Sequence, residues 1–329
     1  MLPQRPALDK ENVNPSALVG EMHKDIRNLI NKDLFKRRVV RGDSMQGIQT
    51  LNKPSTAPDE RPRPVVPCNP QLVPEFRRSI QEFLQKKECF YQVNPLYMNN
   101  QEDISERMRA ILVDWLVDVN LKFKLLPITL FLAVNLIDRF LSKESISRNQ
   151  VQLVGVASLM IVAKFEEIYP PLLKDYVGVC DSAYTREQIL EMESRILLTL
   201  NFNLTQTTSF AFLHAMQLDL QFDAKALAFG QYVIETALFD MSLLKYSNHL
   251  LAAGAVFLVA KVFRKDDWKL DFEVRVGVSE KLSKICAKDL YRAMQVQDKS
   301  PLMALKRKFA TPQYFEMSKY RIEKISTSS

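Results

Sequence analysis

Apolar residues recur every three to four positions along most of the chain, the spacing typical of an α-helix with a buried face. Residues 108–119, MRAILVDWLVDV, carry the densest example. One stripe of this predicted helix, at positions i, i+3, i+4 and i+7, consists of Met108, Ile111, Leu112 and Trp115. The opposite side carries Ala110, Val113, Leu116 and Val117, so that only Arg109, Asp114 and Asp118 interrupt the apolar surface. A helix that is apolar nearly all round is typically buried, so at least one face is expected to pack inside the protein.

The same periodicity predicts further helices between residues 74 and 203. The expected elements are a helix that opens at Pro74 and ends near Lys87, and helices at about 104–122, 128–142, 148–165 and 185–200. Two of them follow strong start signals, because Pro127 precedes one and Thr185 with Gln188 forms a capping box for another. Few stretches alternate with period two, so the pattern predicts an all-α fold.

The second half of the chain repeats the plan of the first. Two uncharged apolar runs of 15 residues, 149–163 and 246–260, each end in Val-Ala and are followed by a lysine. These lysines, Lys164 and Lys261, lie 97 residues apart, which is a domain-sized spacing. We therefore predict a duplicated helical domain that divides near residue 203. Both runs are shorter than the roughly 18–20 residues of a membrane span, which predicts a soluble protein without a membrane partner.

The beginning of the chain differs in composition from the rest. Ten of the 16 prolines but only one of the 31 aromatic residues fall in residues 1–74. Such a segment buries too little apolar surface to offset its chain entropy. The predicted organisation is a disordered tail at 1–66, an N-terminal helix and first domain at 67–203, and a second domain with a C-terminal extension at 204–329.

Charge and reactive residues argue against catalysis and against nucleic-acid binding. Residues 67–329 hold 33 Lys and Arg against 30 Asp and Glu, so the net charge of +7 leaves no strongly basic domain. The four cysteines are far apart and the three histidines are isolated, which argues against a zinc site and a clustered catalytic base. The eight glycines form no phosphate-binding loop. We expect no enzyme activity, no metal, no cofactor and no direct nucleic-acid partner.

Several motifs resemble those of the cyclins, specifically of the mitotic A/B type. They are YMNNQEDI at 97–104, MRAILVDWLVDV at 108–119, LFLAVNLIDRFL at 130–141, QLVGVASLMIVAKFEEIYPP at 152–171 and QILEMESRILLTLNF at 188–202. The resemblance implies two tandem five-helix cyclin boxes preceded by an N-terminal helix, and a role as the regulatory subunit of a cyclin-dependent kinase in mitosis. The second half matches less well. The positions that depart from the family's common prolines and tyrosines are Thr207, Asn248, Val276 and Val278.

The resemblance assigns the kinase contact to the first domain. Lys164 and Glu193 stand at the positions where similar cyclins anchor the mobile helix of the kinase. The apolar residues expected to exclude water beside them are Phe165, Ile168 and Phe202. Without the resemblance, the two charged residues are more typical of solvated groups at helix ends.

The resemblance also implies a docking patch for substrates and inhibitors that carry basic-leucine motifs. We use the name docking patch for Met108, Ile111, Leu112 and Trp115 together with Asp118 and Gln152. The apolar members are expected to be exposed and to take the leucine, while Asp118 faces the basic residue. Ala110, Val113 and Val117 would then pack inside the first domain. On spacing alone, this stripe is more typical of a core.

Two motifs in the tail resemble signals that the mitotic ubiquitin ligase reads. Arg5 and Leu8 belong to an R-x-A-L destruction box, and a KEN box follows, formed by Lys10, Glu11 and Asn12. A linear motif must be reached in extended form, which a poorly foldable tail permits. An R-x-x-L match alone is also compatible with random tail sequence.

Two further points stay open in the sequence. The Lys-Arg-Arg run at 36–38 is compatible with nuclear import or with a solvated charge run, and we expect a protein of the nucleus and cytoplasm. A cyclin-box protein that acts in transcription has the same doubled architecture and is the alternative to a mitotic function.

Overall fold

The computed structural model describes residues 76–88, 92–220, 222–263 and 272–320. These residues form α-helices and short 3-10 helices, and no β-strand occurs in the described part of the chain. They all belong to one compact unit, residues 69–329. The predicted all-α fold is confirmed. The predicted tail with its degron motifs, and the helix start at Pro74, lie outside the described residues.

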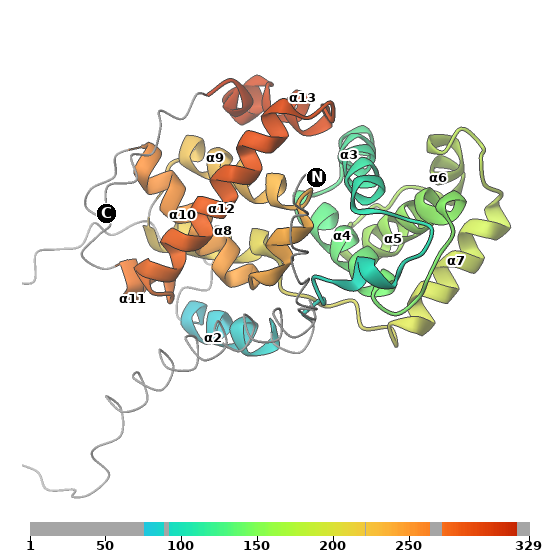
Figure 1. Cartoon of the computed structure of the whole chain (residues 1–329), viewed down its shortest axis with the longest axis horizontal. Helices are drawn as coiled ribbons and strands as arrows, with labels where there is room; N and C mark the ends of the chain where they lie inside the picture. Colours follow the sequence, from blue (N-terminus) through green and yellow to red (C-terminus); the bar gives the residue numbers. More distant parts are fainter. Residues whose placement is uncertain (1–75, 89–91, 221, 264–271, 321–329) are drawn as a thin grey trace, which may run out of the picture. The chain divides into compact units, whose positions relative to one another are not determined.

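Five helices form the first domain, coloured from green to yellow-green in Figure 1. They are α3 (Glu106–Lys122), α4 (Pro127–Leu141), α5 (Val151–Glu166), α6 (Leu173–Val179) and α7 (Arg186–Thr199). Helix α5 packs against all four of the others. Residues 153–163 of α5 are buried without exception, as expected for a central helix that carries no charge along this run.

The second domain repeats this arrangement around α10. Its helices are α8 (Ser209–Leu220), α9 (Ala224–Ala237), α10 (Asn248–Val262), α11 (Phe272–Val276) and α12 (Glu280–Lys299). Helix α10 packs against α8, α9 and α12, and its residues 249–260 are all buried. The two tandem five-helix domains are confirmed, and the two apolar runs of the sequence become their central helices. A short helix, α13 (Ala304–Phe309), follows and packs against α3 of the first domain.

Capping residues decide where several helices begin. Ser105 Oγ accepts a hydrogen bond from the N–H of Met108, so α3 begins at Glu106, two residues later than predicted. The capping box predicted at Thr185 and Gln188 is confirmed, with both of its hydrogen bonds formed. The helix expected from residue 148 opens as a 3-10 turn before α5. The 3-10 helices are η2 (Tyr97–Asn100), η3 (Arg148–Gln150), η4 (Met241–Lys245), η6 (Pro312–Tyr314) and η7 (Met317–Lys319).

The N-terminal helix, α2 (Arg77–Glu88), packs against α8 of the second domain (Figure 1). Its last residue, Glu88, reaches the start of α10, where its carboxylate accepts the N–H of His249 at 3.0 Å. Burial raises the pKa of Glu88 to about 7. Two positions that depart from the family's prolines meet nearby, because Asn248 Nδ2 donates to the carbonyl oxygen of Thr207 at 2.9 Å. A proline at position 248 has no side-chain donor for this bond.

A buried ion pair connects α3 to α4 within the first domain, and its arginine also contacts the second domain. Arg109 of α3 and Asp138 of α4 each have side chains that are 2% exposed, and Arg109 Nε and Nη2 donate to the two Asp138 oxygens at 2.6 and 2.7 Å. The Tyr97 hydroxyl donates to the same carboxylate at 2.7 Å. Arg109 Nη1 donates to the carbonyl oxygen of Leu238, in the second domain, at 2.7 Å. In the sequence Arg109 only interrupts an apolar pattern, whereas in the structure its hydrogen bonds connect the two domains.

Candidate functional site

Lys164 and Glu193 meet on the surface of the first domain. Lys164 lies in the last turn of α5 and Glu193 in α7, and Lys164 Nζ lies 2.6 Å from Glu193 Oε1. The Lys164 side chain is half exposed, whereas the Glu193 side chain is largely buried. Both residues stand on helices that pack directly against each other, so the two charges are held in defined positions.

Large apolar side chains follow each member of this pair along the chain and are exposed. They are Phe165, Ile168, Tyr169 and Leu172 after Lys164, and Leu198 and Phe202 after Glu193. Ile168 is 86% exposed and Phe202 is 64% exposed. Several large apolar groups left in water on the two chain segments that carry one ion pair are typical of a surface that binds another protein. We call this pair and these six side chains the apolar rim.

Phe202 of the apolar rim is held in a left-handed backbone conformation. Its φ is 54°, and that of the preceding Asn201 is 50°. This conformation is uncommon for a bulky residue and costs on the order of 1–3 kcal/mol. The domain gains little burial of the Phe202 ring in return, since that ring stays exposed. Backbone strain of this kind clusters at functional sites.

Glu167 fixes the turn from which the most exposed side chains project. Its Oε1 atom accepts the N–H of Leu126 at 2.8 Å and the hydroxyl of Thr129 at 2.6 Å. The turn after α5 is therefore attached to the beginning of α4, and Ile168 and Tyr169 follow immediately after this attachment. Sequence reasoning missed Glu167, because its partners lie 41 and 38 residues away.

The docking patch is less exposed than the sequence predicts. Met108 and Trp115 are half-buried and pack against the core of the first domain. Leu112 is only 5% exposed, so the prediction that it lies on the surface is wrong. The cause is Gly155 on α5, where a Cβ atom would lie 2.6 Å from Leu112 Cδ1. Because glycine leaves this space open, the Leu112 side chain packs down onto α5.

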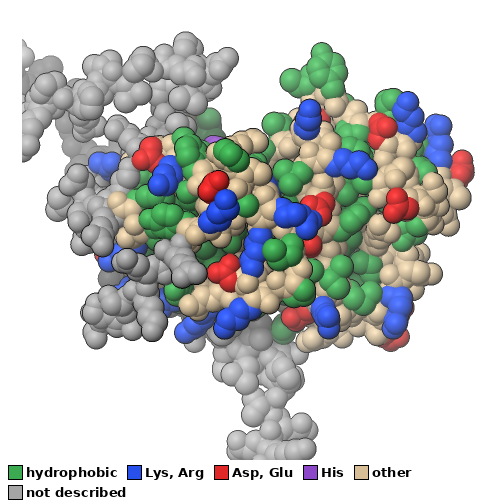
Figure 2. All heavy atoms as spheres, turned by 90° about the horizontal axis from the view of Figure 1, so that it is seen from above, with side chains coloured by type: hydrophobic (Ala, Val, Ile, Leu, Met, Phe, Trp, Pro, Cys, Tyr) green, Lys and Arg blue, Asp and Glu red, His purple; other side chains and the backbone are tan. Residues whose placement is uncertain are grey.

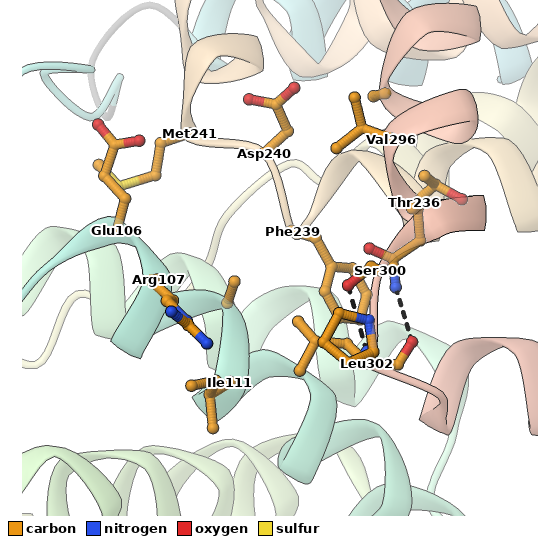
Figure 3. Close-up of a pocket in the computed structure, with 14 residues that line it drawn as sticks. Glu106, Arg107, Ile111, Thr236, Phe239, Asp240, Met241, Val296, Ser300 and Leu302 are labelled. Atoms are coloured by element: carbon orange, nitrogen blue, oxygen red, sulfur yellow. Dashed lines mark hydrogen bonds between the residues drawn. The ribbon is translucent and has the colours of Figure 1, made fainter.

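Ile111 is the exposed apolar member of the docking patch, and it faces a cleft. Figure 3 shows Ile111 of α3 and Val296 of α12 on the walls of this cleft, whose volume is about 440 Å³. Ala110 was expected to pack inside the first domain, but it is half-buried and lines the same cleft. Val113 and Val117 are buried as predicted. Ala110 differs from the prediction because residues of the second domain form the opposite wall of the cleft at this end of α3.

The polar members of the docking patch have different environments. Asp118 Oδ2 lies 2.6 Å from Nη2 of Arg307, which belongs to α13. Gln152 lies in the first turn of α5 and is half-buried. Arg148, one turn before Gln152, pairs with Asp103 at 3.0 Å. The acidic end of the patch therefore has an internal partner, which sequence reasoning missed because Arg307 lies 189 residues from Asp118.

Clusters and shifted pKa values among the titratable and metal-ligating side chains of the described residues indicate where reactive groups lie. Among them, no group of three or more His, Cys, Asp or Glu side chains is placed to hold a metal ion. Cys180 and Cys286 are free and buried, and burial raises the pKa of the Cys180 thiol to about 11. Burial also lowers the pKa of His214. On the face that Figure 2 shows, Lys and Arg side chains lie interspersed with Asp and Glu.

Within the described ranges, no helix combines the length and the apolar character that crossing a bilayer requires. This finding concerns the helices α2 to α13 alone.

Comparison with known protein families matches both halves of the chain. The family model described as "Cyclin, N-terminal domain" matches residues 79–205, and the one described as "Cyclin, C-terminal domain" matches residues 207–323. The chain is 38% identical over 241 residues to Cyclin-B2-2 of Arabidopsis thaliana, covering 73% of this chain and 56% of that protein. It is 34% identical over 245 residues to the G2/mitotic-specific cyclin-A of Hydra viridissima, covering 74% and 58%. The chain thus spans less than two thirds of the length of these relatives.

A solved structure has a similar fold. The X-ray structure of a viral cyclin from herpesvirus saimiri superposes with a TM-score of 0.61, covering 69% of this chain and 99% of that chain. The two sequences are 17% identical, so this similarity concerns the arrangement of the helices.

Proposed function

The chain belongs to the cyclin family, and we propose that it is the activating and substrate-docking subunit of a cyclin-dependent serine/threonine kinase that controls mitosis. Its curated relatives include B2-type and A-type mitotic cyclins, which favours this function over a cyclin-box protein of transcription. Cyclins are regulatory subunits of kinases, and on this proposal the chain contributes no catalytic group to the reaction.

The observation that carries this proposal is the apolar rim around Lys164 and Glu193. In the free chain these two side chains neutralise each other at 2.6 Å. The ammonium group has three donors and the carboxylate has several acceptor sites, so both retain capacity to bond a partner. A kinase helix that covers Phe165 and Ile168 excludes water, which strengthens the charge-assisted hydrogen bonds it forms with the pair.

The proposed mechanism is a shift between conformations of the kinase. A kinase that populates an inactive arrangement when alone becomes active if its partner binds only the active one, by an amount set by the difference in affinity. A surface held by packed helices, such as that of α5 and α7, discriminates well between two positions of a kinase helix because it does not adapt to both.

Affinity purification of the full chain from dividing cells tests the proposed partner. We expect a cyclin-dependent kinase to be recovered with it in stoichiometric amount. Recovery of transcription factors without such a kinase would instead favour the alternative of a transcriptional cyclin-box protein.

We further propose that the docking patch recruits substrates and inhibitors with basic-leucine motifs. Support comes from Ile111, which is exposed, and from Met108 and Trp115, which are half-buried at the surface of α3. The buried Leu112 forms the floor beneath them rather than a contact surface. Asp118 supplies the charge complementary to the basic residue of the motif.

Timed destruction in mitosis is a further proposal, which concerns the tail. Removing residues 1–15, or changing Arg5, Leu8 and the KEN box at 10–12 to Ala, is expected to lengthen the half-life of the protein at mitotic exit. The physical reason is that the ligase must bind these motifs in extended form before it can modify nearby lysines such as Lys24. Cycloheximide chase in synchronised cells measures the half-life.

The matched control for this experiment changes Arg61 and Arg63, two other tail arginines, to Ala and is expected to leave the half-life unchanged. Equal half-lives for the wild type and the variant without residues 1–15 would contradict timed destruction through these motifs.

We also propose that the protein occupies both the nucleus and the cytoplasm, with the basic run at 36–38 aiding import. Substitution of this run by Ala, followed by imaging, tests that localisation.

A further inference from the structure

We propose that Arg307 of α13 is an internal competitor for the acidic end of the docking patch, which a basic residue of an incoming motif must displace from Asp118. This inference rests on the proposed docking function and assigns a specificity-determining role to a residue of the second half of the chain. The contact that carries it is the 2.6 Å ion pair between Arg307 Nη2 and Asp118 Oδ2.

Helix α13 is held against α3 beside the docking patch, and this packing keeps Arg307 close to Asp118. The Asp114 carboxylate of α3 accepts the N–H of Ala304 at 3.0 Å, at the beginning of α13. Leu305 and Phe309 are fully buried on the other side of α13. An arginine on a fixed helix loses less entropy on pairing with Asp118 than a free peptide does, which makes it an effective local competitor.

The two lysines that flank Arg307 are engaged elsewhere. Lys308 is buried and its Nζ donates to both carboxylate oxygens of Glu235 at 2.7 Å. Lys306 Nζ hydrogen-bonds the carbonyl oxygen of Asp298. Arg307 is therefore the basic group of α13 that engages Asp118, and a substitution at this one position removes the contact.

The Arg307–Asp118 pair can be displaced because it lies at the surface. The Arg307 side chain is 60% exposed and the Asp118 side chain is 45% exposed. Ion pairs in water are weak and are screened by salt, so a motif that also inserts a leucine into the apolar part of the patch can replace Arg307. Asp114 is less suited to bind a motif, because one of its oxygens already holds α13.

The internal pair lowers the advantage that a basic residue gives to a docking motif. A motif with arginine must break the Arg307 contact before it gains its own, whereas a motif with leucine alone leaves that contact intact. Removing Arg307 is thus expected to raise the affinity for basic-leucine motifs and to leave the affinity for leucine-only motifs unchanged. The size of the gain follows from the strength of an exposed ion pair, which corresponds to about two- to fivefold in Kd.

The test is peptide binding to the full chain, measured by fluorescence polarisation at low salt. One labelled peptide carries an Arg-x-Leu motif, and a second is identical except for Ala in place of Arg. The variant Arg307→Ala is expected to bind the Arg-x-Leu peptide about two- to fivefold more tightly and the Ala-x-Leu peptide as the wild type does. The matched control is Arg292→Ala, which removes another exposed arginine from an ion pair, with Asp289 on α12, and is expected to change neither affinity.

Two further variants separate the inference from the docking function on which it rests. In an Asp118→Asn background, Arg307→Ala is expected to give no gain, because the contested carboxylate is gone. The double variant Met108→Ala with Trp115→Ala is expected to weaken the binding of both peptides. If it does so, but Arg307→Ala leaves the affinity for the Arg-x-Leu peptide unchanged or lowers it, the docking function stands and the competitor role of Arg307 is overturned. If neither peptide binds the wild type or Arg307→Ala, the docking function itself fails and this inference fails with it.

Discussion

Replacing Asp138 with Asn is expected to destabilise the chain by about 3–5 kcal/mol, the cost of leaving a buried charge without its partner. The carboxylate accepts two bonds from Arg109 and one from Tyr97, and both ionic side chains are 2% exposed. An asparagine presents one oxygen and one NH2 group to this set of donors, so at least one donor is left unpaired in the core. The midpoint temperature of thermal unfolding is expected to fall by roughly 10 °C for a chain of this size.

Two variants identify the cause of this loss. Asp103→Asn breaks the exposed pair with Arg148 and is expected to shift the unfolding temperature far less. Replacing the whole buried group by apolar residues, as Tyr97→Phe, Arg109→Met and Asp138→Leu, is expected to recover most of the stability that Asp138→Asn loses, since no buried charge remains. A normal unfolding temperature for Asp138→Asn would show that the ion pair does not hold α3 in place.

The double variant Lys164→Ala with Glu193→Ala is expected to lose activation of the partner kinase while it keeps its fold. Polar groups at the centre of an apolar interface cost several kcal/mol when truncated, so binding is expected to weaken on the order of a hundredfold or more. The fold is expected to persist, because a partly exposed ion pair contributes about 1 kcal/mol or less to stability. Kinase activity at rising concentrations of the variant measures activation, and circular dichroism measures the fold.

A second ion pair on the same helix provides the matched control. Arg195 of α7 pairs with Glu144 at 2.7 Å, and it lies two residues along from Glu193, on the other side of the helix. Arg195→Ala with Glu144→Ala is expected to leave activation intact. Activation by the Lys164 and Glu193 variant at the level of the wild type, in a folded protein, would remove this pair from the kinase contact.

The helices of this chain could be predicted from the sequence because their signals are local. Apolar periodicity and a capping box placed α7 to within a residue of its ends, and an uncharged apolar run identified the central helix α5. These signals depend on neighbours within one or two turns, which the sequence presents directly.

The environment of individual side chains could not be predicted in the same way. Leu112 is buried because Gly155 of a different helix leaves space for it, and nothing in the stripe around Leu112 indicates this. Arg109 and Asp138 did carry a signal, since each is a charge within a nearly uncharged run and the two have opposite sign. Arg307 carried none, because its pairing with Asp118 depends on how α13 packs against α3.

The most direct test of the central claim is the titration of a purified, inactive cyclin-dependent kinase with the full chain, with phosphate transfer to a short peptide substrate as the readout. A peptide without a docking motif reports activation alone and is independent of the docking patch. The proposed function predicts that the kinase is nearly silent by itself and that its rate rises to a plateau at one chain per kinase. An unchanged rate at every concentration of the folded chain, across the mitotic kinases of dividing cells, would contradict it.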